Sequence, residues 1–313
     1  MEPIVNVVLP VFAIILAGFL TGQFRLLGEE SSEALNRFVY YVALPVLLFY
    51  SLARVEPDRI FNWPFIFAFT AGSVVTMALA ILAARLLFRM SFAENTLFGT
   101  TAVWANTGYM GIPLVIVAFG QSAALPAIIV TVIQSMVLVP LITVLLQAGR
   151  GGAGVGRVLK ALVQSPLVVA PMLGMAWSLG GWVLPAPVET FCAILSPAAG
   201  PAALFAIGLF LVGKPIKRGF AEVAAMTGFK LIVHPLITWW CITSLVDLDP
   251  LWTAVGVLTA ALPAGANCFV IAQNYGLYVH RTSAAILVST IVAVITVSLL
   301  FGMPVLTAVA GRS

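Results

Sequence analysis

The sequence predicts an all-α polytopic membrane protein with ten transmembrane helices, arranged as an inverted 5+5 repeat with broken helices at spans 4 and 9. Three observations lead to this fold class. The composition is too apolar for a soluble domain, ten bilayer-length apolar runs follow one another along the chain, and the two halves of the chain align with each other. Together they indicate a protein whose working surface lies inside the bilayer.

The composition alone excludes a soluble fold. Hydrophobic residues make up 62% of the 313 residues and charged residues only 8%, against about 25% charged in a soluble domain. The small net charge of +4 is scattered over loops and indicates no nucleic-acid partner. Cys192, Cys241 and Cys268 fall inside apolar segments without metal-site spacing, so we expect no metal and no cofactor.

Ten apolar runs have the length of about 20 residues that a helix needs to cross a bilayer. They cover residues 3–22, 37–54, 62–84, 95–120, 123–147, 159–180, 188–212, 224–246, 252–276 and 283–308. Hydrocarbon offers the backbone no water, so each run should be helical. The first run is preceded by no positive n-region, and it therefore predicts a first transmembrane helix and no signal peptide.

Lysine and arginine residues divide unequally between the two sides of the membrane. The side with both termini holds three, namely Arg54, Arg59 and Arg312. The other side holds eleven, namely Arg25, Arg37, Arg85, Arg89, Arg150, Arg157, Lys160, Lys214, Lys217, Arg218 and Arg281. Basic loops stay in the cytoplasm, so both termini are expected to lie outside it.

The chain aligns with itself, without gaps, at an offset of 156 residues. Five proline or glycine pairs match at this offset: Pro10 with Pro166, Gly18 with Gly174, Pro45 with Pro201, Gly72 with Gly228, and Gly120 with Gly276. The alignment gives two halves, residues 1–148 and 159–313. Because each half has an odd number of spans, the second half enters the membrane from the opposite side, as in secondary transporters. A chance alignment of two hydrophobic halves is the alternative.

Spans 4 and 9 both contain poor helix formers at their centres. Span 4 reads WANTGYMGIP at residues 104–113, and the offset places AALPAGANCF, residues 260–269, at the matching position. Proline removes a backbone donor, and glycine lowers the cost of unwinding. Two interrupted spans in corresponding positions indicate a transport site, and half-helix N-termini there suit an anion. Simple proline kinks with packing glycines are the alternative.

Four motifs resemble the auxin efflux carrier family over the whole chain: ANTGYMGIPL in span 4, LPAGANCFVIAQNYG in span 9, LPVLLF in span 2 and SAAILVSTIVAVITV in span 10. That family includes plant PIN-type auxin exporters and bacterial malonate and malate carriers. The resemblance implies a bacterial inner (cell) membrane protein whose helices 4 and 9 cross at mid-membrane. It also implies a scaffold of spans 1, 2, 6 and 7 and a moving transport domain of spans 3–5 and 8–10. The short link AGRGGAGVGR replaces the long regulatory loop of the plant proteins.

Polar residues inside other spans are further candidates. Lys230 and His234 lie one turn apart on span 8, and an ionisable residue inside the membrane is a functional candidate. Snorkelling of Lys230 to the cytoplasmic interface is the alternative. Gln134 of span 5 falls on Thr290 of span 10 at the same offset. These two residues either face the crossing point or hold helices together.

We therefore expect a secondary-type transporter of a small organic anion, a carboxylate such as malonate, malate or an auxin-like acid, that works by alternating access. The predicted substrate-binding residues are Asn106, Thr107, Gly108, Tyr109, Gly111, Pro113, Gln134, Lys230, Pro263, Gly265, Asn267 and Thr290. The expected partners are the anion and the lipid bilayer, with a homodimer left open. No enzyme is expected, because no catalytic cluster or phosphate-binding loop appears. A structural or receptor-like membrane protein is the alternative.

Overall fold

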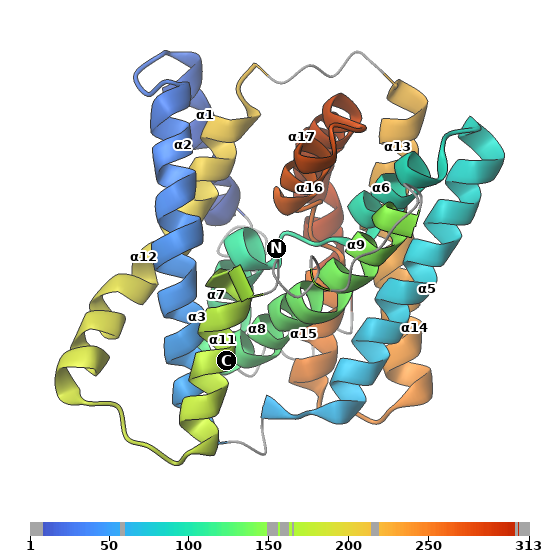
Figure 1. Cartoon of the computed structure of the whole chain (residues 1–313). Coiled ribbons are helices and arrows are strands. Elements are labelled where there is room, and N and C mark those ends of the chain that lie inside the picture. The colour runs from blue at the N-terminus through green and yellow to red at the C-terminus, as the bar shows by residue number, and fades with distance from the viewer. Residues whose placement is uncertain are drawn as a thin grey trace.

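The computed structural model describes residues 9–56, 60–148, 156, 163–164, 166–213, 219–303 and 306. Over these residues the secondary structure is helical, apart from one isolated bridge between single residues, so the predicted all-α class is confirmed (Figure 1). Several predicted loop charges lie outside the described residues, namely Arg59, Arg150, Arg157, Lys160, Lys214, Lys217, Arg218 and Arg312.

The helices of the first half are α1 (Leu9–Gln23), α2 (Glu29–Phe38), η2 (Val39–Ala43), α3 (Leu44–Ala53), α5 (Trp63–Phe88), α6 (Phe92–Val103), η3 (Thr107–Gly111), α7 (Ile112–Phe119), η4 (Gln121–Ala123), α8 (Ala124–Ile133), η5 (Gln134–Leu138) and α9 (Val139–Ala148). Those of the second half are α11 (Pro166–Leu179), α12 (Ala186–Leu211), α13 (Phe220–Gly228), η6 (Phe229–Val233), α14 (His234–Leu245), α15 (Pro250–Ala260), α16 (Asn267–Tyr275) and α17 (Val279–Leu300).

Six helical stretches in the described part of the chain are long and apolar enough to cross a membrane. They are Glu30–Ala53, Trp63–Phe88, Gln121–Leu146, Ala186–Leu211, Phe220–Leu245 and Val279–Leu300. Four shorter apolar helices have 10–17 residues: Leu9–Gln23, Thr107–Phe119, Pro166–Leu179 and Pro250–Ala260. Length and composition thus support several membrane spans, while the total of ten stays a prediction.

The helix that contains the predicted second span begins before residue 37. The helix already begins with α2 at Glu29 and continues through η2 into α3. Its first ten residues, EESSEALNRF, are polar and strongly amphipathic, and Arg37 bonds Glu33 across one turn at 2.6 Å. A search for apolar runs detects only the part of a helix that could lie in hydrocarbon, so it misses a polar extension of this kind.

Four helices widen into a π-helical turn just before a proline. The turns η2, η3, η5 and η6 each end two residues before a proline, namely Pro45, Pro113, Pro140 and Pro235. Proline lacks the backbone donor and pushes against the carbonyl four residues earlier. A π-helical turn relieves that contact by inserting one extra residue, and such turns are frequent at functional sites. Three of the four turns hold predicted site residues, Thr107, Gln134 and Lys230.

The helices pack in two groups (Figure 1). In the first group α1 packs on α12, and α3 packs on α11 and α12. Gly18 and Gly208 bring α1 and α12 so close that a Cβ on either would overlap the backbone of the other helix, as is usual where helices associate through small residues. In the second group α5 packs on α6 and α14, α14 packs on α15, and α13 packs on α17.

Candidate functional site

Two chain segments cross where α6 and α15 end. Residues 104–106 follow α6 and residues 261–266 follow α15, and neither segment is helical. Ala105 and Ala264 form an isolated antiparallel bridge. The amide of Asn106 donates to the carbonyl of Pro263 at 2.9 Å, and the amide of Gly265 donates to the carbonyl of Trp104 at 3.0 Å. Buried backbone groups need partners, and here the two segments satisfy each other.

The bridge has a local two-fold symmetry. A two-fold axis through it exchanges Ala105 with Ala264, and it exchanges the two backbone hydrogen bonds with each other. These two alanines are 159 positions apart, not 156. The gapless offset of 156 pairs Thr107 with Pro263, whereas the two-fold axis of the bridge relates Trp104 to Pro263. Irregular backbone can absorb such an insertion without disturbing the helices on either side.

The helices that resume after the crossing direct their first turns towards it. In the first half η3 begins at Thr107, and in the second half α16 begins at Asn267. The amide of Ala264 donates to the hydroxyl of Ser289 on α17 at 3.1 Å. This bond fixes the second segment from the side opposite its partner strand.

A small cavity lies against the crossing. Its lining consists of Leu44, Trp104, Ala105, Asn106, Thr107, Gly108, Tyr109, Thr131, Gln134, Ser135, Leu167, Gly265, Ala266 and Asn267. Its volume of about 20 Å³ is close to the minimum that a single water requires. Leu44 and Leu167 of the lining belong to α3 and α11 of the first group, while the rest belongs to the crossing and to η3, α8, η5 and α16.

Amide and hydroxyl groups supply the polar part of this lining. Thr107 donates its hydroxyl hydrogen to the Gln134 side-chain oxygen at 2.8 Å. The Gln134 side-chain nitrogen is buried and has no hydrogen-bond partner among the described residues. The side-chain amides of Asn106 and Asn267 likewise bond to none of the side chains or backbone groups that the structure describes. The cavity thus presents unused N–H donors.

Seven of the twelve predicted site residues line this cavity: Asn106, Thr107, Gly108, Tyr109, Gln134, Gly265 and Asn267. The other five do not. A Cβ on Gly111 would meet Leu262 at 2.7 Å, and Pro113 lies against Gly200 of α12. Thr290 donates its hydroxyl hydrogen to the carbonyl of Ile286, one turn earlier on its own helix. Pro263 accepts a backbone hydrogen bond at the crossing, and Lys230 bonds the carbonyl of Ala260, at the end of the helix that leads into the crossing.

Lys230 does not extend to the membrane interface. Its side chain is fully buried, and its Nζ donates to the carbonyl of Ala260, the last residue of α15, at 2.5 Å. The Nδ1 atom of His234 lies 3.2 Å from Nζ, and the Nε2 atom lies 3.2 Å from the hydroxyl of Ser73. The side chains of Ser73, His234 and Lys230 therefore form a buried chain that reaches the end of the broken helix.

Leu44 and Leu167 are lining residues that the sequence analysis did not identify. Both are apolar and lie at the starts of their helices, α3 and α11. Neither residue type indicates a site, and the offset of 156 relates them to Gly200 and Val11, which do not line the cavity. Only the packing of α3 and α11 against the crossing reveals them. Hydroxyl groups on η5 and α8, from Ser135 and Thr131, complete the lining.

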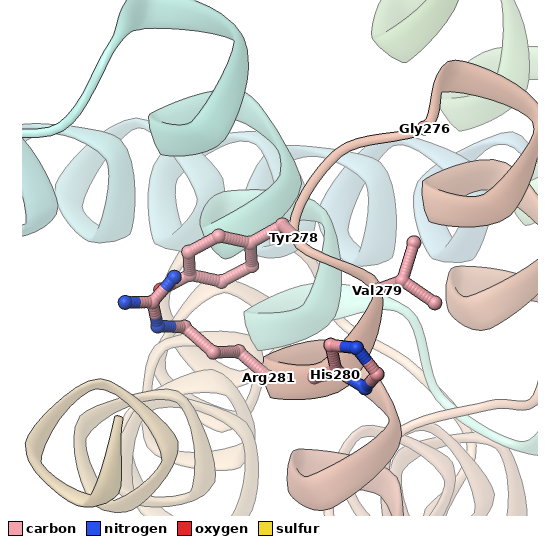
Figure 2. Close-up of a pocket in the computed structure, with 5 residues that line it drawn as sticks. All are labelled: Gly276, Tyr278, Val279, His280 and Arg281. Carbon is pink, nitrogen blue, oxygen red and sulfur yellow. The ribbon is translucent and has the colours of Figure 1, made fainter. Parts of the chain in front are cut away.

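A larger and more open pocket, of about 380 Å³, lies where α16 leads into α17. Figure 2 shows its five lining residues, with the Tyr278 ring beside the Arg281 guanidinium and Val279 and His280 pointing elsewhere. Arg281 Nε lies 3.2 Å from Glu222 Oε1 and its guanidinium stands 5.2 Å from the Tyr278 ring centre. Burial raises the pKa of the Tyr278 hydroxyl above its ordinary value. These contacts tie the start of α17 to α13, so we assign the pocket a structural role.

No group of three or more metal-ligating side chains occurs within the described residues. The cysteines are free and buried at Cys192, Cys241 and Cys268. The chemistry available at the crossing is therefore hydrogen bonding by neutral side chains and backbone amides.

Comparison with known proteins identifies relatives along nearly the whole chain. A family model described as "Membrane transport protein" matches residues 3–156 and 153–301. A "Putative malonate transporter" of Rhizobium meliloti is 31% identical over 303 residues, which cover 95% of each chain. An uncharacterized transporter of Methanothermobacter thermautotrophicus is 30% identical over 93% of this chain and 95% of its own. Auxin efflux carrier component 5 of Arabidopsis thaliana is 23% identical over 93% of both chains.

Proposed function

Because the chain belongs to the membrane transport protein family, which includes the auxin efflux carriers that its motifs resemble, we propose that it is a secondary transporter of a small organic anion. The family comprises multi-pass membrane transporters and not enzymes. The observation that carries the proposal for this chain is the cavity at the crossing, whose polar lining is rich in unused donors and free of carboxylates.

The donors of the cavity match a carboxylate. An amide N–H binds an anion without needing neutralisation itself, and the lining holds three such amides, on Asn106, Gln134 and Asn267. A buried donor left without a partner costs about 1–3 kcal/mol. A ligand carboxylate would remove that cost at Gln134, whose buried side-chain nitrogen has no partner among the described residues. The first turns of η3 and α16 would add backbone donors.

The position of the cavity supports alternating access. We propose that α1, α2–α3, α11 and α12 form the scaffold, as spans 1, 2, 6 and 7 of an inverted 5+5 repeat, and that the remaining helices form the moving domain. The cavity lies between these groups, with Leu44 and Leu167 on the scaffold side. A volume of about 20 Å³ cannot hold an organic acid, so the two groups must separate before the substrate enters.

The names of two relatives narrow the substrate class. One is described as a malonate transporter and another as an auxin efflux carrier component, and both malonate and auxin are carboxylic acids. We propose a small mono- or dicarboxylate for this chain. Gly108 adds no side chain to the lining, whereas the Trp104 ring fills the space beside Gly265, where an added Cβ would lie 2.8 Å from Trp104 Cδ1.

Purified protein in proteoliposomes tests this function directly. We expect saturable uptake of radiolabelled malonate or indole-3-acetate, inhibited by excess unlabelled acid, and no such uptake by protein-free liposomes. Binding of either acid without any uptake would favour the receptor-like alternative. The absence of both binding and uptake for the two acids would contradict the proposal.

We further propose that the protein lies in a bacterial inner membrane with both termini outside the cytoplasm. The basis is the three-to-eleven division of basic residues. A Ser313→Cys variant should react with an impermeant maleimide added to intact cells. Gly28→Cys, at an exposed site with nothing within 4 Å of the added Cβ, should react only after lysis. The reverse labelling pattern would invert the topology.

A further inference from the structure

The buried chain of Ser73, His234 and Lys230 lies behind the crossing and does not line the cavity. All three side chains are fully buried. Ser73 belongs to α5, Lys230 to η6 and His234 to α14, and the chain of contacts ends on the carbonyl of Ala260 in α15. All four residues belong to spans of the proposed moving domain, so whatever charge they carry moves with the substrate.

Two acceptors surround the Lys230 nitrogen. One is the carbonyl of Ala260, which ends α15 and therefore lies at the negative end of that helix dipole. The other is His234 Nδ1. We assign Lys230 as an ammonium group, which has three donors and no acceptor, because it satisfies both contacts and because its charge is the premise of the inference below. His234 is then neutral, with its proton on Nε2, and donates to the Ser73 hydroxyl. This assignment gives every ring nitrogen in the chain a partner.

With this assignment, the Lys230 ammonium has no protein counter-ion in the described part of the chain. The ion pairs found there are Arg37–Glu33, Arg54–Glu189 and Arg281–Glu222. The helices packed against η6 carry their other charged groups at their ends, at Arg85 of α5, at His280 of α17 and at Glu94, which belongs to the cap of α6. A further titratable group that interacts electrostatically with Lys230 is the Cys268 thiol, whose sulfur lies 4.0 Å from the carbonyl oxygen of Thr100. A buried unpaired ammonium is costly.

We propose that Lys230 is the fixed counter-charge of the transported anion, and that the moving domain therefore crosses the membrane without net charge when it holds a monocarboxylate. Lys230 does not touch the substrate. It acts through space, because it bonds the carbonyl that ends α15, the helix that leads into the crossing. In the empty domain the same lysine leaves one positive charge. This inference rests on the proposed transport function and assigns a charge preference to it.

The proposed counter-charge predicts that exchange and net uptake differ in how their rates depend on membrane potential. In exchange with saturating substrate on both sides, only the loaded domain moves, so a monoanion should exchange at a rate independent of membrane potential. In net uptake the empty domain must return with its positive charge, so the rate should depend on potential. At 100 mV, a unit charge that crosses the whole field favours one direction of movement over the other about 50-fold. If this effect divides equally between the two directions, one step slows about 7-fold and the other speeds up about 7-fold, so a full exchange cycle slows about 3- to 4-fold at either sign of potential.

Proteoliposomes clamped with valinomycin and potassium gradients give the test, with indole-3-acetate as the monoanionic probe. We expect wild-type exchange to be unchanged at 100 mV while net uptake varies. Exchange by Lys230→Met should slow by up to about 3- to 4-fold at both signs of potential, and Lys230→Arg, which keeps the charge, should behave as wild type. A purely structural lysine would change rates equally at all potentials.

If Lys230→Met fails to fold, the comparison of exchange with net uptake in the wild-type protein still decides the inference. Exchange as sensitive to potential as net uptake would overturn it, and so would Lys230→Met exchange that ignores potential. If wild-type protein neither binds nor exchanges malonate or indole-3-acetate, the transport function itself fails and the counter-charge with it. If exchange occurs but its rate depends on potential, only the counter-charge role of Lys230 is contradicted, and the proposed transport function is not.

Discussion

Oxidation of a Pro113→Cys/Gly200→Cys double variant to a disulfide is expected to stop transport completely, and reduction is expected to restore it. Pro113 lies on α7 of the proposed moving domain and Gly200 on α12 of the proposed scaffold. A Cβ on Gly200 would lie 3.2 Å from the Pro113 Cβ, near the separation of about 3.5–4.5 Å found in disulfides. A covalent bond there would hold the two groups in the arrangement of this structure, in which the cavity is too small for an organic acid.

A matched pair inside one group provides the control. A Cβ on Gly72 of α5 would lie 3.4 Å from the Thr238 Cβ of α14, so Gly72→Cys/Thr238→Cys should form a similar bond. Both helices belong to the proposed moving domain, and oxidation should leave uptake unchanged. Uptake would be measured before and after oxidation in a background lacking the native cysteines. Full activity of the oxidised Pro113–Gly200 variant would refute relative movement of the two groups.

Replacing Asn106 by alanine is expected to weaken substrate binding by roughly 10- to 150-fold. The loss of one hydrogen bond to a charged group costs about 1.5–3 kcal/mol, which corresponds to that range. Asn267→Ala should act similarly, since its amide lines the same cavity. Asn106→Asp should be worse, because it places a negative charge against an anion. Isothermal titration of the detergent-purified protein with malonate and indole-3-acetate measures each effect.

Thr290→Val is the matched control for these variants. Thr290 is a buried polar residue that bonds its own helix and does not line the cavity, so its loss should leave affinity nearly unchanged.

The Lys230→Gln variant distinguishes a substrate site at the crossing from a substrate site beside span 8. Normal affinity in both asparagine variants, together with loss of binding in Lys230→Gln, would place the substrate beside span 8 and contradict the proposed site.

The sequence was most informative where local chemistry determines local structure. Glycine, proline and asparagine in residues 104–113 and 260–269 predicted interrupted helices, and the chain is non-helical at 104–106 and 261–266. The interruption in the first segment lies before Pro113, not at it, because a π-helical turn absorbs the proline. The motifs of the same segments identified the family, which the family model confirms.

The contacts that the sequence could not predict depend on backbone groups or on apolar side chains. Lys230 bonds a backbone carbonyl, that of Ala260, and a carbonyl carries no residue signature. Leu44 and Leu167 line the cavity only because α3 and α11 happen to face it. The bridge residues Ala105 and Ala264 are 159 positions apart and not 156, and a gapless comparison cannot follow a difference in length between two irregular segments.

The backbone bridge at the crossing has a consequence for the direction of net substrate transport. The residues that flank Ala105 and Ala264 hold the two segments together through two main-chain hydrogen bonds, so in the proposed transport cycle the donors of one segment would keep their distance from those of the other. If the scaffold side of the lining, Leu44 and Leu167, changes equally in both states, the proposed site would have the same intrinsic affinity inside and outside. Such a carrier would have no built-in rectification. Import and export would then be set by the concentration gradient and the membrane voltage, and the same molecule could serve a cell that excretes an acid and a cell that scavenges it.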